Sequence, residues 1–362
     1  MLLYSRKKHN HSQDCVLFDK IKKKEYVKDS ERSEEMTNKE ARKVKWGIIG
    51  LGDIARDFAE TLPTHNAELL AVGSRHLQKA KDFALEFSSS KAYGNYHLLI
   101  RDPEVDAVYI ATPNHRHGKD IIECLKNGKH VFCEKSITLT NAELNEAQKL
   151  AKKNNLVLAE AMTIYHMPLY QNIHKYIQEN DLGEMRLVQA SFGAYQEHNS
   201  DNRFFSKALG GGALYDIGVY ALAFVRQFLP ANDVEITSMV NLYETGVDEE
   251  ALIQLRNKAG QMANVSLSFR AKIPQIGMVV FENAYISISG YSRADKAIVT
   301  YSDGREVTIT AGQRAKAFQY EIENFSNMVL GGEDISLLSH TIDVTDWMDQ
   351  LSKQWGMTFP KE

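Results

Sequence analysis

The chain is poor in cysteine, in long apolar runs and in concentrated positive charge. Its 362 residues include three cysteines, and the net charge is −4. Such a sparse, odd set without metal-ligand spacing predicts reduced thiols and neither a disulfide framework nor a metal site. No apolar run approaches the roughly 20 residues that span a membrane, and no sustained basic stripe favours nucleic acid as a partner. The N-terminus also lacks the apolar segment and small-residue cleavage site of a secretory signal, so we expect a cytoplasmic protein.

The length and composition favour two globular domains preceded by a tail. At 362 residues, 43% hydrophobic and 25% charged, the chain exceeds the usual size of one core. Residues 1–43 differ from the rest, because Lys, Glu, Asp and Ser dominate from Lys20 to Arg42. Such a segment buries too little apolar surface to order itself, so we expect a disordered or loosely helical extension. Met36 lies shortly before the first strand, which suggests the hypothesis that it is the native start and that the extension before it is non-native.

Between residues 44 and 162, short apolar runs alternate with amphipathic segments. The runs lie at residues 44–49, 68–73, 106–111, 130–133 and 156–159, and the helical segments at about 53–62, 77–87, 118–127 and 140–154. Asn127-Gly128 is a helix C-cap signal, and Thr140 to Glu143 forms a capping box. Strands that alternate with helices predict a parallel sheet covered on both faces.

The rhythm changes in the second domain, residues 163–362. Alternating apolar and polar runs lie at residues 185–195, 235–243, 249–256, 261–269, 276–281 and 284–289. Consecutive strands without intervening helices predict a mostly antiparallel sheet. One helix near 210–228 interrupts the strands, and helices near 313–330 and 341–355 follow them. The fold class is therefore α/β, with a parallel sheet followed by a large, mostly antiparallel one.

A G-x-G-x-x-A motif, Gly50 to Ala55, connects the first strand to the first helix. Gly50 allows the sharp turn, Gly52 lets a pyrophosphate approach the backbone, and Ala55 permits close packing of helix and strand. Asp53 and Ile54 open the helix, whose free N–H groups and partial positive charge suit phosphate. The motif predicts a dinucleotide site.

The second strand ends in Gly73-Ser74-Arg75-His76, without the acid that binds the adenosine ribose of NAD. Ser74 can donate to a 2′-phosphate and Arg75 can pair with it, which favours NADP while leaving NAD open. The alternative is that Arg75 is a solvated loop residue.

Two further strand ends carry polar groups. Thr112-Pro113-Asn114-His115-Arg116-His117 follows the strand at 106–111, and Glu134-Lys135-Ser136 follows the strand at 130–133. Ligands bind at such carboxyl ends in open α/β sheets. We expect the loop from Thr112 to His117 to border the nicotinamide ribose, although a plain turn with surface histidines is the alternative.

The dipeptide Glu134-Lys135 suggests a role in proton transfer. A partly desolvated Lys135 beside nicotinamide would have a lowered pKa and act in proton transfer. Glu134 would position it or bind ribose hydroxyls. The alternative for Lys135 is an ordinary surface lysine.

The segment Gly210 to Tyr220 leads three glycines into a helix. Asp216 and Tyr220 are four residues apart and share a face of that helix. A Tyr220 hydroxyl near Lys135 could exchange the proton that accompanies hydride transfer, provided that a nearby cation lowers its pKa. The alternative is a core aromatic with a satisfied hydroxyl.

Together these motifs, in this order, resemble the Gfo/Idh/MocA family, named for glucose–fructose oxidoreductase and inositol dehydrogenase, over residues 44–357. The resemblance implies an N-terminal Rossmann domain, a C-terminal α/β domain with a large open sheet, and an active site between them. It places the family lysine at Lys135 and the second catalytic position at Tyr220. Tyrosine there is similar to the branch with glucose–fructose oxidoreductase and dimeric dihydrodiol dehydrogenase, whose members favour NADP. Asp216 would support substrate hydroxyls or the helix face.

The chain departs from the family pattern at two places. Ser136 replaces the proline of the family's E-K-P motif, which leaves the presentation of Lys135 less certain. Tyr165 stands where relatives commonly have arginine. Tyr165, His166 and Arg203 thereby become candidates for substrate selection.

The leading hypothesis is an NADP-dependent oxidoreductase that moves a hydride between nicotinamide and a carbinol carbon of a sugar, polyol or vicinal diol. One alternative is a catalytically silent NAD(P)-binding regulator. Another is an enzyme that uses a tightly held cofactor for sugar chemistry without net redox change. Because a broad sheet face needs covering, and relatives pair through it, we expect a homodimer or homotetramer.

Overall fold

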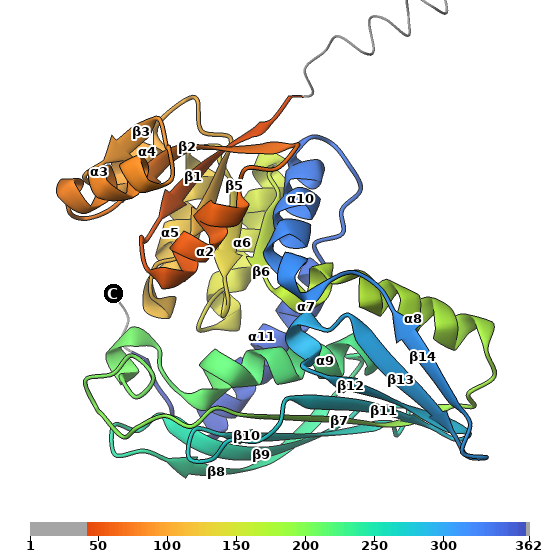
Figure 1. The fold of residues 1–362 in the computed structure, drawn as a ribbon. Coiled ribbons are helices and arrows are strands. Elements are labelled where there is room, and N and C mark those ends of the chain that lie inside the picture. Colours follow the sequence, from red (N-terminus) through yellow and green to blue (C-terminus); the bar gives the residue numbers. More distant parts are fainter. Residues whose placement is uncertain (1–41, 360–362) are drawn as a thin grey trace, which may run out of the picture. The chain divides into compact units, whose positions relative to one another are not determined.

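The computed structural model describes residues 42–359 (Figure 1). The N-terminal extension expected from the sequence, including Met36, lies outside the described residues except for its last two positions. The described chain forms two sheets: sheet A, with the order β3-β2-β1-β4-β5-β6, and sheet B, with the order β14-β13-β12-β11-β7-β10-β9-β8.

Sheet A is parallel throughout, as the alternation of strands and helices predicts. Its strands are β1 (Val44–Ile49), β2 (Ala67–Gly73), β3 (Lys91–Tyr93), β4 (Ala107–Ile110), β5 (His130–Glu134) and β6 (Leu158–Ala161). Its helices are α2 (Asp53–Thr61), α3 (Leu77–Glu86), α4 (Tyr96–Ile100), α5 (Asn114–Lys126) and α6 (Asn141–Asn154). The expected capping box at Thr140 and Glu143 is present.

Both faces of sheet A are covered by helices. Trp46, Phe58, Phe132 and Phe325 form an aromatic core on one face, where Trp46 and Phe325 ring centroids are 5.1 Å apart. Phe325 belongs to α10 (Ala317–Val329), which returns from the C-terminal part of the chain to pack on this face. On the other face, α5 and α6 bury residues such as Ile121 and Leu144. Polar groups of sheet A are therefore confined largely to its edges and strand ends.

Sheet B is antiparallel except for the parallel pair β7 and β10. Its strands are β7 (Met185–Gly193), β8 (Glu235–Leu242), β9 (Asp248–Arg256), β10 (Met262–Ser268), β11 (Ile276–Phe281), β12 (Ala284–Ser289), β13 (Lys296–Tyr301) and β14 (Glu306–Thr310). The remaining helices are α7 (Thr163–His166), α8 (Pro168–Glu179), α9 (Val219–Phe228) and α11 (Leu338–Gln354), with short turns η1 (Lys207–Leu209), η2 (Leu214–Gly218), η3 (Tyr291–Arg293) and η4 (Arg314–Lys316).

Helix α9 covers the inner face of sheet B (Figure 1). The segment Lys207–Phe228, which includes this helix, is by length and composition apolar enough to cross a membrane, but 78% of its apolar window is buried inside the protein. The sequence pattern did not indicate an apolar run of this length. Because most of the segment is buried, we interpret it as the core helix that packs on sheet B.

Several elements were not indicated by the sequence pattern. They are β3, α4, α7, α8, β13 and β14. Helix α5 also begins at Asn114, four residues before its expected start, because Pro113 adopts the extended N-cap conformation and the helix follows at once.

Candidate active site

The glycine turn after β1 has the geometry that a dinucleotide requires. Gly50 has φ +85°, and a Cβ there would collide with the backbone of Ala111 and Thr112. Gly52 forms the N-cap of α2 without a side-chain cap, and the space around its Cα is open. Free backbone N–H groups beside open space suit a pyrophosphate, so these residues fit the cofactor that the motif predicts.

At the end of β2, Ser74 is buried and its hydroxyl oxygen accepts the His76 N–H at 3.2 Å. Arg75 is exposed, and its charge acts against the burial that raises the pKa of Tyr96. The guanidinium of Arg116 lies 5.7 Å from the centroid of the same ring. Arg75 and the Ser74 hydroxyl thus lie at the strand end where an adenosine ribose is read, in keeping with a 2′-phosphate site, whereas Arg116 is paired with Asp120 Oδ1 at 2.8 Å.

The loop after β4 is held by buried hydrogen bonds. Thr112 Oγ1 donates to Asp120 Oδ2 at 2.8 Å. His117 is fully buried, with Nε2 at 2.7 Å from the Thr112 carbonyl oxygen and Nδ1 at 2.8 Å from the Ser136 carbonyl oxygen. Burial lowers the pKa of His117, although both carbonyls oppose this shift. Because both ring nitrogens face protein carbonyls, His117 joins two loops, and a contact of its ring nitrogens with the cofactor does not fit this geometry.

The side chain of Asn114 connects this loop to the C-terminal half of the chain. Its amide donates to the Gly210 carbonyl oxygen at 3.3 Å. Pro113 stands at the N-cap of α5, next to it. The loop therefore ties the end of β4 to the glycine segment that leads toward Tyr220.

The loop after β5 presents Lys135 from between two anchored neighbours. The Tyr109 hydroxyl donates to the Glu134 carboxylate, and Ser136 Oγ donates to the Tyr215 carbonyl oxygen at 2.9 Å. The Lys135–Ser136 peptide bond is cis. Ser136, which replaces the family's proline, thus gains a hydrogen bond that fastens the loop to the segment carrying Asp216.

Lys135, Asp216, Arg203 and Tyr220 come together in one cluster. Lys135 Nζ donates to Asp216 Oδ1 at 3.0 Å and to the Asp216 carbonyl oxygen at 2.8 Å. It also lies 5.1 Å from the centroid of the Tyr220 ring, and Arg203 Nη1 is 3.5 Å from Asp216 Oδ1. Asp216 lies in the π-helical turn η2, a rare geometry often found at functional sites. Four of the residues singled out in the sequence therefore meet, including Arg203, the candidate for substrate selection.

The electrostatics of this cluster correct two expectations. Burial disfavours the Lys135 ammonium, but Asp216 and Tyr220 outweigh it and raise the pKa of Lys135, where the sequence suggested a lowered one. Burial also raises the pKa of Tyr220 to about 12, even though Lys135 opposes the shift. The pKa of Asp216 is lowered, because Lys135 and Arg203 outweigh the effect of its burial. At neutral pH the cluster is an ammonium–carboxylate pair beside a protonated phenol.

Two charged residues that the sequence reading missed also act on this phenol. Arg293 lowers and Glu321 raises the pKa of Tyr220, although burial has the largest effect. Glu321 is fully buried in α10, and neither carboxyl oxygen has a hydrogen-bond partner among the described residues. Both side chains come from segments remote from the motifs, and no spacing in the sequence connects them to Lys135.

Tyr165 and His166 lie elsewhere in the core. The Tyr165 ring packs edge-on against His340 of α11, with centroids 6.0 Å apart. His166 Nδ1 lies 3.3 Å from the Asn324 amide of α10, and burial lowers the pKa of His166 to about 4. Within residues 42–359 the structure records no contact between these two side chains and Lys135, so their proposed part in substrate selection gains no geometric support.

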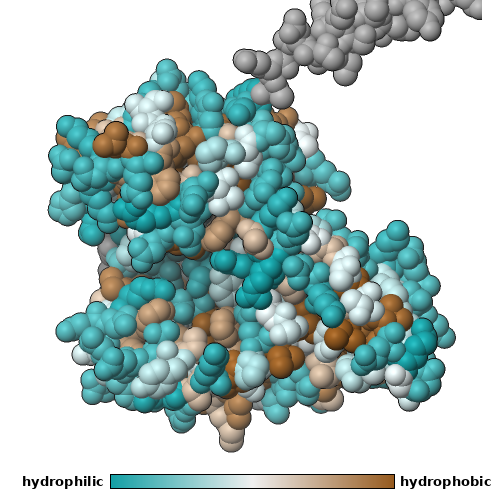
Figure 2. All heavy atoms as spheres, viewed as in Figure 1, coloured by the Kyte–Doolittle hydropathy of each residue, from teal (hydrophilic) through white to brown (hydrophobic). Residues whose placement is uncertain are grey.

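Figure 2 shows a recess, lined largely by hydrophilic residues, between the part of the surface over sheet A and the part over sheet B. Within residues 42–359 no group of three or more His, Cys, Asp or Glu residues is placed to hold a metal ion.

Comparison with known proteins identifies the two parts of the chain. Residues 44–162 match the oxidoreductase family with an NAD-binding Rossmann fold, and residues 170–290 match the GFO/IDH/MocA C-terminal domain. A Xenopus tropicalis protein named trans-1,2-dihydrobenzene-1,2-diol dehydrogenase is 31% identical over 329 residues, covering 87% of this chain and 99% of that protein. A human protein of the same name is 27% identical, with 88% and 99% covered.

Solved structures share the fold over nearly the whole described chain. A 3-ketoreductase from Actinomadura kijaniata, in complex with NADP, is 24% identical with a TM-score of 0.76 and covers 85% of this chain and 96% of its own. A levoglucosan dehydrogenase, in complex with NADH and levoglucosan, is 18% identical with a TM-score of 0.77 and covers 88% and 98%. The motifs, the two sheets and these matches agree: the chain belongs to the Gfo/Idh/MocA family of oxidoreductases with an NAD-binding Rossmann fold.

Proposed function

We propose that this protein is an NADP-linked oxidoreductase that interconverts a hydroxyl and a carbonyl on a vicinal diol, polyol or sugar. The observation that carries the proposal is the Lys135–Asp216–Tyr220 cluster, with Nζ of Lys135 3.0 Å from Asp216 Oδ1 and 5.1 Å from the Tyr220 ring centroid. The relatives named trans-1,2-dihydrobenzene-1,2-diol dehydrogenase match nearly their whole length, which supports a diol as substrate.

The division of labour along the chain follows from the fold. Residues 44–162 bind the cofactor, and residues 163–362 supply Asp216, Tyr220 and the substrate side. Gly50, Gly52, Asp53 and Ile54 hold the pyrophosphate at the start of α2. Thr112, Asn114 and Glu134 border the nicotinamide ribose, and a bound nicotinamide supplies or accepts a hydride.

The protonation states of Tyr220 and Lys135 determine which group transfers the proton. In the direction of reduction, the Tyr220 hydroxyl keeps its proton at neutral pH and donates it to the oxygen of the carbonyl that is being reduced. The Lys135 ammonium, fixed by Asp216, stabilises the negative charge that develops on that oxygen. In the direction of oxidation the proton moves the other way, to the deprotonated form of Tyr220, so that direction should be favoured as the pH rises toward the Tyr220 pKa of about 12.

NADP is the favoured cofactor because Ser74 and Arg75 occupy the end of β2 in place of an acid. A guanidinium and a hydroxyl at this place pair with a 2′-phosphate, whereas an acid would repel it.

The outer face of sheet B supports an oligomer. The register between strands places Met239, Leu252, Met262, Ile276 and Tyr285 on one face, and all five are exposed. No helix among the described elements covers this face (Figure 1). An exposed apolar face of this extent marks an interface, so we assign it to a second copy of the chain in a homodimer or homotetramer. The buried thiols Cys124 and Cys133 suit a cytoplasmic setting.

The test uses the purified full chain. NADPH and NADH are titrated separately by fluorescence, and trans-1,2-dihydrobenzene-1,2-diol, cyclohexanediols, aldoses and inositols are then offered with NADP and NAD while the reduced nicotinamide is followed. We expect tighter binding of NADPH and turnover of at least one diol or sugar. Tight cofactor binding without turnover across the panel would favour a regulator. Cofactor that copurifies and survives dialysis would favour sugar chemistry without net redox change.

A further inference from the structure

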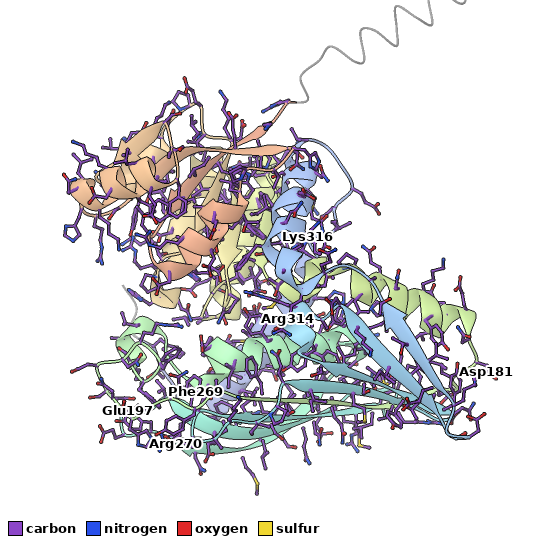
Figure 3. All side chains as sticks on the ribbon, in the orientation of Figure 1. Asp181, Glu197, Phe269, Arg270, Arg314 and Lys316 are labelled. Carbon is purple, nitrogen blue, oxygen red and sulfur yellow. The ribbon has the colours of Figure 1, made fainter. Side chains whose placement is uncertain are left out.

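A pocket lies at the N-terminal end of α10, between this helix and the short turns η3 and η4. Its volume is about 360 Å³, and it is lined by Arg293, Arg314, Ala315, Ala317 and Phe318. Figure 3 labels Arg314 and Lys316 at this end of the helix, on the side that faces sheet B. Two of the five lining residues are arginines, and no acid lines the pocket.

Arg293 is held in place without an ion pair. Its guanidinium lies 4.5 Å from the centroid of the Phe318 ring, and the residue is half-buried. Among the described residues no carboxylate lies within ion-pair distance of it. A stacked guanidinium keeps its donors directed outward, as a receptor for a planar oxyanion requires.

Arg314 is positioned from the other side of the pocket. Gly290 has φ +62°, and a Cβ there would lie only 2.5 Å from Arg314 Nη1, so the glycine makes room for the arginine. The Asp295 carboxylate accepts the backbone N–H of Arg314 at 3.0 Å. That carboxylate is engaged at the backbone, and the guanidinium remains among the groups that line the pocket.

Electrostatic effects connect the pocket to the reaction centre. The turn η3, which carries Arg293, packs against α9, which carries Tyr220, and the charge of Arg293 acts on Tyr220, Glu134 and Glu321. Burial raises the pKa of Glu134 and, much further, that of Glu321.

We propose that the pocket of Arg293 and Arg314 binds an oxyanion carried by the substrate, so that the enzyme prefers a diol or sugar bearing a carboxylate or phosphate. The proposal rests on the proposed function, which it narrows from neutral diols and sugars to acidic ones. Paired guanidinium groups recognise carboxylate and phosphate by charge-assisted, bidentate hydrogen bonds, and they offer no comparable partner to an aldehyde or a hydroxyl.

The experiment offers matched compounds to the full-length enzyme with its cofactor. D-glucose, D-glucuronate and D-glucose 6-phosphate form one set, and D-galactose with D-galacturonate forms another. Turnover and calorimetric binding are measured for the wild type, for Arg293→Gln and for Arg293→Lys. We expect an acidic member to exceed its neutral partner by about tenfold or more in kcat/KM or in affinity. Comparison of glucuronate with the phosphate separates the two sources of the oxyanion.

The variants show whether Arg293 carries the discrimination. In Arg293→Gln the ratio of kcat/KM between the acidic and the neutral member should fall to about one, mainly through the KM of the acidic member. Any effect of the lost charge on Tyr220 alters both members alike and cancels in this ratio. Arg293→Lys should retain part of the advantage, because it keeps the charge but loses the bidentate fork. Arg305→Gln is the matched control, because Arg305 also stacks on an aromatic ring, 3.7 Å from the Tyr301 centroid, but in a different part of the sheet.

The outcomes separate the two proposals. Acidic compounds that bind in an Arg293-dependent manner without turnover would uphold this inference and contradict the proposed function. Equal turnover of neutral and acidic members, unchanged in Arg293→Gln, would uphold the proposed function and overturn this inference. The absence of any Arg293-dependent difference in either binding or turnover would overturn it as well.

Discussion

The two sheets bury their surfaces differently, and each contributes a different kind of functional surface. Sheet A is covered by helices on both faces, and its strands β4, β5 and β6 are almost uniformly buried. Sheet B alternates buried and exposed residues and keeps one face open, as the pattern of β9 shows. A sheet that is covered on both faces can present reactive groups only at its strand ends, whereas a half-covered sheet can bind a partner through its face.

This contrast explains why the reaction centre lies where the two parts meet. Lys135 follows the end of β5 in sheet A, while Asp216 and Tyr220 belong to the helical segment that covers sheet B. Neither sheet supplies the whole cluster. Substitutions at strand ends should therefore damage chemistry or cofactor binding, and substitutions on the open face should damage assembly only.

The largest effect on turnover is expected in the cluster of Lys135, Asp216 and Tyr220. Tyr220→Phe removes the hydroxyl that donates the proton, so turnover should fall by about 10²–10⁴-fold while NADPH affinity stays nearly unchanged. Steady-state kinetics and a fluorescence titration measure both quantities. Tyr195→Phe, at an exposed tyrosine, is the control and should behave like the wild type. Retained turnover in Tyr220→Phe would remove this residue from the mechanism.

A buried acid of sheet A should affect stability in a pH-dependent way. Burial raises the pKa of Glu160 to about 7, although its carboxylate accepts the Ile137 N–H at 3.0 Å. Because the folded pKa exceeds the ordinary one, the stability of the wild type should fall as the pH rises from about 4.5 to 7. Glu160→Gln removes the charge, so relative to the wild type it should gain up to roughly 3 kcal/mol between pH 5 and pH 8.

Unfolding by urea at the two pH values measures this difference. Glutamine keeps a carbonyl for the Ile137 N–H and an amide for the hydroxyl of Thr341, which Glu160 also contacts. Glu68→Gln, at an exposed position of β2, is the control. If Glu160→Gln and the wild type differ equally at both pH values, the burial of a charged Glu160 is not the cause.

The end of β2 should govern the choice of cofactor. Arg75→Gln removes a guanidinium from the expected 2′-phosphate site, so NADPH affinity should fall by about 10–100-fold and NADH affinity should change little. Separate fluorescence titrations with the two cofactors measure this. Lys79→Gln, which alters an exposed cation on the neighbouring helix α3, should leave both affinities unchanged. An equal loss for both cofactors would place Arg75 away from the 2′-phosphate.

The open face of sheet B should matter least to the reaction. Leu252→Lys places a charge on the open face, where Leu252 pairs with Met239 of the edge strand β8. Light scattering should show dissociation to monomers, whereas turnover per chain should stay within about twofold, since surface changes usually alter stability by less than about 0.5 kcal/mol. Leu85→Lys, at a leucine that is 86% exposed on α3, is the control. A monomeric wild type would refute the assignment of this face.

The sequence predicted the elements of sheet A more completely than the strands of sheet B. The parallel sheet, the glycine turn, the capping box at Thr140 and the meeting of Lys135 with Tyr220 follow from local patterns and from their order, whereas the ion pair of Lys135 with Asp216 was not expected. Strands β13 and β14 were missed, although the turn residues Ser302-Asp303-Gly304 lie between them, because their short apolar runs are mixed with polar residues.

The chemistry of the site depended on information that local patterns do not contain. The direction of the pKa shifts at Lys135 and Tyr220 was wrong, because it depends on burial depth and on which carboxylate reaches the ammonium. Arg293 and Glu321 could not be identified either, since α10 and η3 reach the site only through the tertiary fold. His117 was recognised as part of a motif, but its two carbonyl partners, not a ligand, determine what it does.

The most direct test of the account is Lys135→Met, with turnover of an accepted substrate and NADPH affinity measured on the same preparation. The account predicts that turnover falls by about 10²–10⁴-fold while the fluorescence titration stays close to that of the wild type, because the ammonium acts on the reacting oxygen and the glycine turn binds the cofactor. Turnover close to the wild-type value would contradict the assignment of Lys135, Asp216 and Tyr220 as the reaction centre.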